Sequence, residues 1–307
     1  MKNFMFVILV MGALATGAFA QSSLFDRYDV NMTKWAQIPP GPEWGGETSA
    51  VAADGKGTVI VMTRVAPYVR VFTTDGKFVK SWGEQGSFGM AHSVHFDREG
   101  NIWAADPIWH VVHKFDANGK VLLTLGKKQV AGDNTSQDAF NQPNFVGFGP
   151  AGDVFVSDGY VNSRIVQFTK DGKFVRIFGG AKGNAPGQLQ LPHGVAVDSK
   201  GRVLVSDSDN KRISVFDKEG KFLEVWNAPS RGGIAVSADD TVYVSDVNGG
   251  AVTILKDGKI HDVIRVEGRP HGLGIDPVTL DVYTASSVKA SPNITKSVPR
   301  KPAPRSN

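Results

Sequence analysis

The sequence of 307 residues contains no cysteine. This absence excludes disulfide frameworks, thiolate metal sites, iron–sulfur clusters and cysteine nucleophiles. The sequence also lacks an apolar run long enough to cross a bilayer, because the stretch Phe4–Leu14 falls well short of the roughly 20 residues that a spanning helix needs. No membrane span is therefore expected. The 35 glycines and 16 prolines mark a turn-rich globular chain rather than a low-complexity one.

A surplus of positive charge is absent from most of the chain. The sequence has 34 basic and 30 acidic residues, but Ser287–Asn307 contains five of the basic residues and no acidic one. Without these five and Lys2, 28 basic residues remain against 30 acidic ones, so the body has a net charge of −2. We therefore expect no nucleic-acid partner for the folded body.

The first 20 residues predict a signal peptide. Lys2 supplies the positive charge, Phe4–Leu14 supplies the apolar segment, and Ala18–Ala20 matches the small-residue cleavage pattern. The mature chain then begins at Gln21, and an uncleaved anchor is the alternative. Export implies a secreted or periplasmic protein, and the absence of cysteine favours a bacterial periplasm.

The remaining sequence is built from a repeat. Each copy has a short apolar run, a glycine turn, a second run that commonly ends in Ser-Asp, and two further runs separated by another glycine turn. Apolar residues alternate within the runs, which predicts four short antiparallel strands per copy. The copies are spaced 43, 52, 49, 39 and 39 residues apart and begin at Ser49, His92, Asn144, His193, Gly232 and His271. This period predicts an all-β, six-bladed β-propeller over residues 21–286.

The sixth copy is incomplete, because His271–Ser286 supplies only two inner strands. We expect Leu24–Ala36 to supply outer strand material for this blade, so that N-terminal strands close the ring and no edge stays open. The tail Ser287–Asn307 is rich in proline and basic residues, and it is expected to be disordered. A tether to an anionic surface is the alternative role for this tail.

Three histidines occupy one register of the repeat. His92, His193 and His271 begin blades two, four and six, which lie about 120° apart around a six-bladed ring. Their imidazoles should converge at one mouth of the central channel and form a three-histidine site with an open position, which suits zinc. The alternative is that each histidine merely starts an inner strand. The other histidines lie outside this register and are expected to be structural: His95, His110, His113 and His261.

Two loop residues should share the mouth with the histidines. In a propeller, the loop between strands two and three opens on the same face as the start of strand one, and this loop contains Arg64 in blade one and Tyr160 in blade three. A phenol beside a divalent metal and a guanidinium loses its proton more easily, so Tyr160 is a candidate base. The alternatives are an aromatic plug for Tyr160 and a carboxylate partner for Arg64.

The repeats resemble NHL-type propellers. Within them, Phe140–Phe168 is similar to the peptidyl-α-hydroxyglycine α-amidating lyases, most specifically over Val156–Phe168, and the similarity extends over Val51–Ser286. The resemblance implies a six-bladed propeller with one zinc, a catalytic tyrosine at Tyr160 and an active-site arginine at Arg64. It implies these zinc ligands: His92, His193 and His271.

The resemblance also implies a reaction. The α-hydroxyl of a carbinolamide meets the zinc, the tyrosinate takes its proton, and the carbon–nitrogen bond breaks to give an amide and glyoxylate. Zinc would act as Lewis acid and template. The substrate would be a small molecule or a peptide derivative, and we expect a monomer. The alternatives are a non-catalytic binding propeller and, second, a propeller lactonase or hydrolase.

The sequence departs from the family pattern at several positions. A second family arginine is Ser208 here, and a family methionine is Arg269, which becomes a possible accessory group for the missing guanidinium. The family's calcium ligands include the backbone carbonyls that match Val51 and Val94. The carboxylate that completes that calcium site is replaced by Gly272, so the site lacks its charged ligand.

Overall fold

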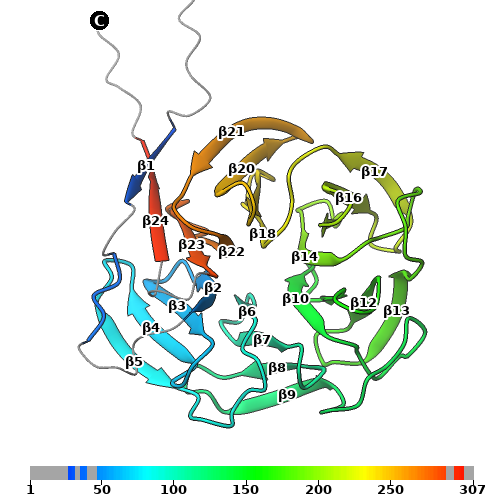
Figure 1. Ribbon diagram of the computed structural model, residues 1–307, viewed down its shortest axis with the longest axis horizontal. Coiled ribbons are helices and arrows are strands. Elements are labelled where there is room, and N and C mark those ends of the chain that lie inside the picture. The colour runs from blue at the N-terminus through cyan, green and yellow to red at the C-terminus, as the bar shows by residue number, and fades with distance from the viewer. Residues whose placement is uncertain (1–26, 32–34, 40–46, 288–293, 301–307) are drawn as a thin grey trace, which may run out of the picture.

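The protein is described by a computed structural model covering residues 27–31, 35–39, 47–287 and 294–300. Within these residues the fold is all-β, without a helix, and its six four-stranded antiparallel sheets stand around a central channel as the blades of a propeller (Figure 1). The predicted six-bladed fold is confirmed. The described residues contain no helix long and apolar enough to cross a membrane. The predicted signal peptide, residues 1–20, lies outside the described residues.

Five blades are formed from consecutive strands. Blade one contains β2 (Thr48–Ala53), β3 (Thr58–Thr63), β4 (Val69–Thr73) and β5 (Phe78–Trp82). Blade two contains β6 (Ser93–Phe96), β7 (Ile102–Asp106), β8 (Val111–Phe115) and β9 (Val121–Gly126). Blade three contains β10 (Pro143–Phe148), β11 (Val154–Asp158), β12 (Arg164–Phe168) and β13 (Phe174–Gly179). The first strand of each blade lines the channel.

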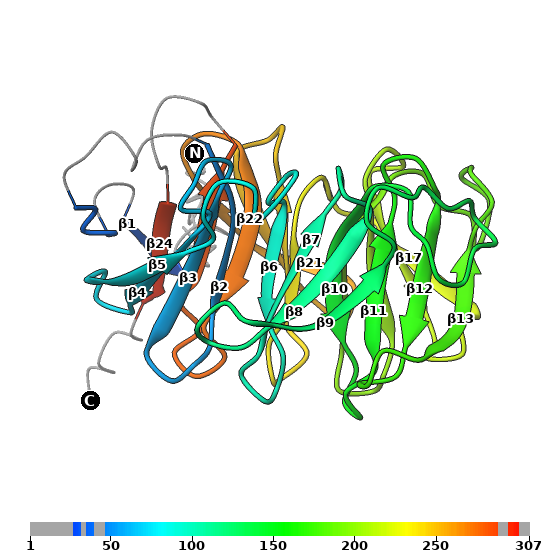
Figure 2. The same ribbon diagram turned by 90° about the horizontal axis from the view of Figure 1, so that it is seen from below.

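Blades four and five repeat this order. Blade four contains β14 (Pro192–Val197), β15 (Val203–Asp207), β16 (Arg212–Phe216) and β17 (Phe222–Trp226). Blade five contains β18 (Ile234–Val236), β19 (Val242–Asp246), β20 (Ala251–Lys256) and β21 (Lys259–Arg265). Seen edge-on, the strands of each blade cross the thickness of the ring (Figure 2).

Blade six joins the two ends of the chain. Its order from the outside is β1 (Tyr28–Asn31), β24 (Ile294–Pro299), β23 (Val282–Ser286) and β22 (Pro270–Ile275). The N-terminal strand thus closes the ring, as predicted. The expectation of a disordered tail is wrong for Ile294–Pro299, which forms the third strand. Its inward residues are buried and its cations have acidic partners, since Lys296 pairs with Asp281 at 2.9 Å and Arg300 with Asp29 at 2.6 Å.

Local sequence explains the turns between first and second strands. In blade two the Asp97 carboxylate accepts hydrogen bonds from the backbone N–H groups of Glu99 and Asn101, at 3.0 and 2.9 Å. Gly100 takes a positive φ of 88° in this turn, a conformation that glycine adopts without steric cost. Such turns return the chain across the blade, and they set the register of the channel-lining strand.

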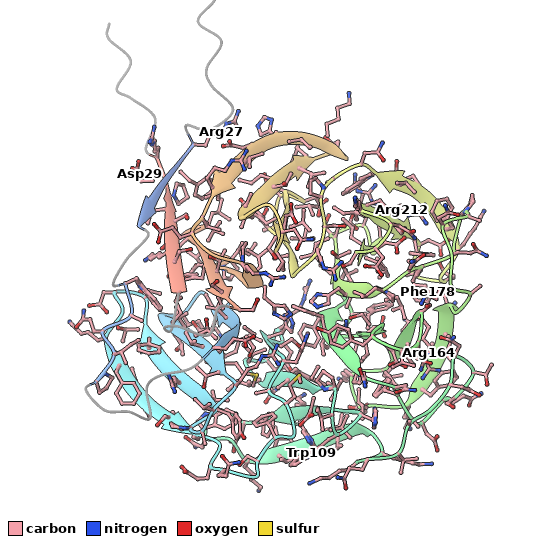
Figure 3. All side chains as sticks on the ribbon, viewed as in Figure 1. Arg27, Asp29, Trp109, Arg164, Phe178 and Arg212 are labelled. Carbon is pink, nitrogen blue, oxygen red and sulfur yellow. The ribbon has the colours of Figure 1, made fainter. Side chains whose placement is uncertain are left out.

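The core lies between the blades rather than inside them. Six clusters of buried apolar side chains each join two neighbouring sheets, and the cluster of Trp35, Val51 and Tyr283 joins blade six to blade one. The repeated arginines support the blades as expected, because Arg164 pairs with Asp158 at 2.9 Å and Arg212 with Asp207 at 2.8 Å. Figure 3 shows both arginines away from the channel, in blades three and four. This ring holds the inner strands in place.

Candidate metal centre and active site

The three register histidines lie together at one end of the channel. His92 immediately precedes β6, while His193 and His271 are the second residues of β14 and β22. One ring nitrogen from each lies within 4.8 Å of the others, and no other group of three or more metal-ligating side chains is this close among the described residues. At most 7% of each residue is exposed. The group could bind a metal ion.

Backbone carbonyls fix the orientation of all three imidazoles. Each histidine donates from Nδ1 to the carbonyl of the register residue in the next blade: His92 to Asn144 at 3.0 Å, His193 to Gly232 at 3.2 Å, and His271 to Ser49 at 2.8 Å. Carbonyls accept only, so each Nδ1 bears the proton and each Nε2 presents a lone pair that can accept a hydrogen bond or bind a metal. All six register positions thus take part in the centre.

The Nε2 atoms are only partly satisfied within the protein. The Tyr160 hydroxyl donates to His92 Nε2 at 2.7 Å and lies 3.3 Å from His193 Nε2. His271 Nε2 is buried without a hydrogen-bond partner among the described residues. A buried acceptor is costly when unpaired, and a cation bound among the three atoms would satisfy it. The residues present therefore fit a metal ion.

Burial keeps these histidines neutral. It lowers the pKa of His92 and His193 well below the ordinary value, and neighbouring histidines and arginines lower it further. Burial likewise lowers the pKa of His271, to about 4, followed by the charges of Arg64 and Arg269. Neutral imidazole is the form that binds metal. The centre is in this form at neutral pH without any carboxylate ligand.

A single aromatic ring forms the floor of the centre. Phe145, on β10, is 1% exposed and lies with its ring centre 4.9 Å from that of His193, 5.6 Å from His92 and 6.0 Å from His271. On its other side it contacts His95 edge-to-face, with ring centres 5.4 Å apart. Phe145 therefore separates the histidine cluster from the rest of the channel. Nothing in the register predicted this role.

Tyr160 stands over the histidines on the loop after β11. Its ring contacts His92 and His193 with centres 5.3 and 5.7 Å apart, while 38% of the residue is exposed to solvent. Burial raises the pKa of the Tyr160 hydroxyl, and the positive charges of Arg64 and then Arg231 lower it in part. The predicted proximity of phenol, guanidinium and histidines is present in this structure.

Arg64 approaches from blade one, and it has a partner that sequence reasoning missed. Its Nε pairs with Glu47 at 2.9 Å, and its backbone N–H also donates to the Glu47 carbonyl at 3.0 Å. One terminal nitrogen, Nη1, is buried without a partner among the described residues. Glu47 lies just before β2, the first strand of blade one, so only its place next to this strand start could have signalled it. Nη1 carries two N–H groups, and both remain for a ligand.

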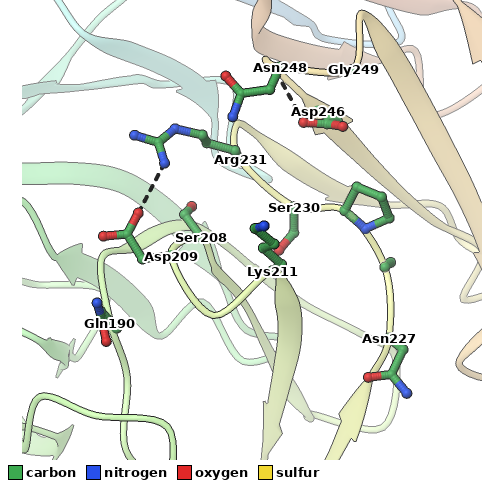
Figure 4. Close-up of a pocket in the computed structure, with 12 residues that line it drawn as sticks. Gln190, Ser208, Asp209, Lys211, Asn227, Ser230, Arg231, Asp246, Asn248 and Gly249 are labelled. Atoms are coloured by element: carbon green, nitrogen blue, oxygen red, sulfur yellow. Dashed lines mark hydrogen bonds and ion pairs between the residues drawn. The ribbon is translucent and has the colours of Figure 1, made fainter.

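Sequence reasoning also missed Arg231, a guanidinium that lies between β17 and β18. It lines an open cleft of about 930 Å³ between blades four and five, and its Nη1 pairs with Asp209 at 3.0 Å (Figure 4). Ser208, the departure noted in the sequence, lines the same cleft. Arg269 precedes β22, with its backbone N–H bonded to Ser286 Oγ at 2.8 Å.

The backbone positions implied for calcium lie on neighbouring inner strands, Val51 on β2 and Val94 on β6. Gly272 packs against blade one so closely that an added Cβ would lie 2.4 Å from the Ala50 Cα and 2.9 Å from the Ser49 carbonyl oxygen. A carboxylate at position 272 would require the backbone to shift. The close packing gives a physical reason for glycine there, and calcium stays an expectation without a charged ligand.

Comparison with known proteins agrees with this architecture. Residues 189–216 match the NHL repeat family. The chain is 32% identical over 203 residues to NHL repeat-containing protein 3 of Homo sapiens, which covers 62% of this chain and 58% of that protein. It is 40% identical over 141 residues to peptidylglycine alpha-amidating monooxygenase of Rattus norvegicus, covering 44% of this chain and 14% of that protein. The matched segments thus span little more than half of these relatives at most.

A third relative and two solved structures extend the comparison. A Caenorhabditis elegans protein named "Probable peptidyl-alpha-hydroxyglycine alpha-amidating lyase" is 32% identical over 151 residues, 48% of this chain and 42% of that protein. A streptogramin B lyase aligns with a TM-score of 0.61 at 12% identity over 91% of this chain and all of that one. A Xanthomonas campestris gluconolactonase aligns with a TM-score of 0.63 at 15% identity, over 84% of this chain and 88% of that one, and such low identities show the fold alone. The resemblance to NHL-repeat propellers and to the peptidyl-α-hydroxyglycine α-amidating lyases, predicted from the sequence, is confirmed.

Proposed function

We propose that the protein is a zinc-dependent lyase that cleaves the carbon–nitrogen bond of an N-acyl-α-hydroxyglycine, giving an amide and glyoxylate. One observation carries the proposal. Three buried, neutral imidazoles converge with their tautomers fixed by backbone carbonyls, a phenol lies beside them, and the positive charge of Arg64 acts on all three. The relatives named as amidating lyases support the reaction class.

His92, His193 and His271 would hold the zinc through their Nε2 atoms. Three protein nitrogens are typical of catalytic zinc sites, which keep a position open for another ligand. When bound, zinc supplies Lewis acidity and a coordination position for a substrate oxygen. The carbonyls of Asn144, Gly232 and Ser49 orient the ligands, and Phe145 excludes water from below.

Tyr160 is the proposed base. Its oxygen lies within hydrogen-bonding distance of two Nε2 atoms, and so it stands at the position where the α-hydroxyl of the substrate would react. With the positive charges of Arg64 and of a bound zinc nearby, Tyr160 would react as its phenolate despite the opposing effect of burial. The phenolate takes the hydroxyl proton, the hydroxyl oxygen forms the aldehyde carbonyl, and the carbon–nitrogen bond breaks. The Tyr160 hydroxyl formed in this step gives its proton to the departing amide nitrogen and returns to the phenolate, so atoms and charge balance. Arg64 stabilises negative charge through its unpaired Nη1.

The rival functions make different demands on this site. A non-catalytic binding propeller would need neither the fixed tautomers nor Tyr160 over the histidines. A lactonase or hydrolase is favoured by the gluconolactonase fold match alone. Its expected calcium site uses carboxylate and amide ligands, and here the register supplies imidazoles. We also propose export after cleavage near Ala20, a monomeric state and a small or peptide-derived substrate.

The test combines metal analysis with turnover of N-benzoyl-α-hydroxyglycine, followed by glyoxylate release. We expect about one zinc per chain, lost in His193→Ala and kept in His95→Asn, a histidine outside the cluster. Tyr160→Phe should keep zinc and reduce turnover by about 10²-fold or more, the usual scale for a positioned base. Arg64→Ala should also reduce the rate with zinc intact, and Arg269→Met tests the accessory role of Arg269. Full zinc without turnover in the wild type would reject the lyase and favour the binding propeller.

A further inference from the structure

A cleft between blades four and five is linked to the candidate metal centre through the backbone, because Arg231 lines the cleft and the next residue, Gly232, accepts the hydrogen bond of His193. It is lined by the loop after β15, by the loop after β19 and by the connection that contains Arg231. Its volume of about 930 Å³ is at the upper end of the range for small-molecule sites. Figure 4 shows the Arg231 side chain reaching from that connection to Asp209. Arg231 is the cation of this cleft whose charge also acts on Tyr160 and His193.

The backbone on both sides of Arg231 is held by hydrogen bonds, on one side to a histidine of the centre and on the other to blade four. The Gly232 carbonyl, one residue later, accepts the hydrogen bond from His193 Nδ1 at 3.2 Å. One residue earlier, the Ser230 carbonyl accepts from Ser206 Oγ at 3.0 Å, and Ser230 Oγ donates to the Arg212 carbonyl at 2.7 Å. The base of the Arg231 side chain is therefore fixed relative to a proposed zinc ligand. A guanidinium on a rigid base is suited to selective binding.

The guanidinium of Arg231 is available to a ligand. Its side chain is 44% exposed and that of Asp209 is 35% exposed, and an ion pair so open to water is weak and exchangeable. Arg64 differs, since only 22% of its side chain is exposed and its Nε is held by Glu47 at 2.9 Å. Arg64 belongs to blade one and Arg231 to the connection between blades four and five, so the two residues come from different sides of the ring. The two cations therefore differ: Glu47 holds the Nε of Arg64, whereas Arg231 can exchange Asp209 for a ligand.

We propose that Arg231 binds the carboxylate of the substrate and makes the site selective for acids over neutral analogues. This proposal rests on the proposed lyase function, whose substrate bears one carboxylate. A guanidinium presents parallel N–H groups that match a carboxylate, and it keeps its charge at every physiological pH. The carboxylate displaces Asp209, which stays in the cleft as a competing acceptor. Arg231 is thus a specificity-determining residue.

The experiment measures binding by calorimetry with N-benzoylglycine, which lacks the reactive hydroxyl, and with its neutral primary amide. We expect the wild type to bind the acid about tenfold more tightly than the amide, a typical gain for one charge-assisted pair. In Arg231→Gln the two affinities should become equal. In Asp209→Asn the acid should bind a few-fold more tightly, because its competitor for the guanidinium is removed. Lys211→Met, a cation of the same cleft, should keep the tenfold preference.

Two results would overturn the assignment. One is equal binding of acid and amide by the wild type, or no binding of the acid at millimolar concentration. The other is a preference that survives in Arg231→Gln and disappears in Arg64→Gln, which would move carboxylate binding to blade one. Turnover of N-benzoyl-α-hydroxyglycine is measured separately on the same samples. An Arg231-dependent acid preference without turnover would reject the lyase and leave the anion site standing, whereas turnover without the preference would do the reverse.

Discussion

Both ends of the central channel contain a histidine with a buried Nε2 atom, yet only one end has the geometry of a ligand set. At the mouth, three imidazoles donate from Nδ1 to backbone carbonyls and direct Nε2 toward one another. At the opposite end, His95 lines an apolar pocket of about 200 Å³, and its Nε2 has no partner among the described residues. Burial lowers the pKa of His95 to about 4, as it does for His271.

Burial alone therefore does not distinguish a candidate ligand from a structural histidine. The difference lies in the acceptor on Nδ1, which fixes the tautomer, and in the presence of two further imidazoles within reach. Phe145 separates the two ends and touches histidines on both sides. The channel thus contains a polar centre and an apolar end only one aromatic ring apart, and each can be perturbed separately.

The largest effect on stability should come from removing β24, because this strand completes blade six and so closes the propeller ring around the channel. Truncation after residue 293 removes β24 and leaves β1 and β23 without the strand between them. It also removes the buried side chains of Ile294, Thr295 and Ser297. We expect loss of cooperative unfolding, or a fall in Tm of more than 10 °C, measured by circular dichroism. Truncation after Arg300 is the control and should melt like the full chain. Equal melting of the two truncated chains would contradict the role of β24.

This strand also shows where sequence reasoning failed for the fold. Five blades follow from glycine turns and alternating apolar residues, and the closure by an N-terminal strand was also predicted. The strand Ile294–Pro299 escaped because it has only two apolar side chains before its final proline and lies among basic residues. Its cations are neutralised by Asp281 and Asp29, which are distant in sequence. Composition describes a segment by itself, whereas its partners decide whether it folds.

For the candidate site, the register brought three histidines together and chain direction added Arg64 and Tyr160. Neither argument could find Glu47 or Arg231, because no repeat position encodes a salt bridge or a cleft between blades. The carbonyl acceptors were hidden for another reason. Any residue offers a carbonyl, so Ser49, Asn144 and Gly232 show no common side chain at the positions that orient the histidines.

Replacing Phe145, the ring beneath the three histidines, should reduce both the stability of the fold and the affinity for zinc. Phe145→Ala removes a buried ring from beneath the three histidines and should cost about 3–5 kcal/mol of unfolding free energy. Because the ligands lose their support, zinc affinity should also fall by about tenfold or more. Phe155→Ala is the matched control, since Phe155 is equally buried in the same blade but packs against Phe178. Denaturant unfolding and zinc titration would show equal destabilisation with zinc affinity reduced only in the first variant.

His95, at the apolar end of the channel, should make the stability of the protein depend on pH. The pKa of His95 is about 4 in the folded protein and near 6.5 when unfolded, so the unfolded state takes up its proton first. Stability from this residue is complete above pH 6.5 and is lost as pH falls toward 4. His95→Phe removes the proton uptake and should stabilise the protein by about 2 kcal/mol at pH 5 relative to its effect at pH 7. A difference independent of pH between 5 and 7.5, measured by urea unfolding, would contradict this account.

The smallest predicted effect concerns one hydroxyl that ties the floor to a ligand. Ser157 Oγ accepts from the Phe145 backbone N–H at 3.0 Å and donates to the His193 carbonyl at 2.5 Å, so it links both parts of the polar end. Ser157→Ala should cost about 1 kcal/mol of stability and weaken zinc binding by a few-fold up to about tenfold. Ser245 occupies the equivalent place in blade five, where its Oγ donates to the Gly233 carbonyl at 3.3 Å, whereas the carbonyl of His271 in the next blade accepts from the Gly233 backbone N–H at 3.1 Å. Ser245→Ala should therefore cost similar stability and leave zinc affinity unchanged. An equal loss of zinc affinity in both variants would contradict this account. It would mean that Ser157 acts through the general stability of its blade and not through a local link between Phe145 and His193.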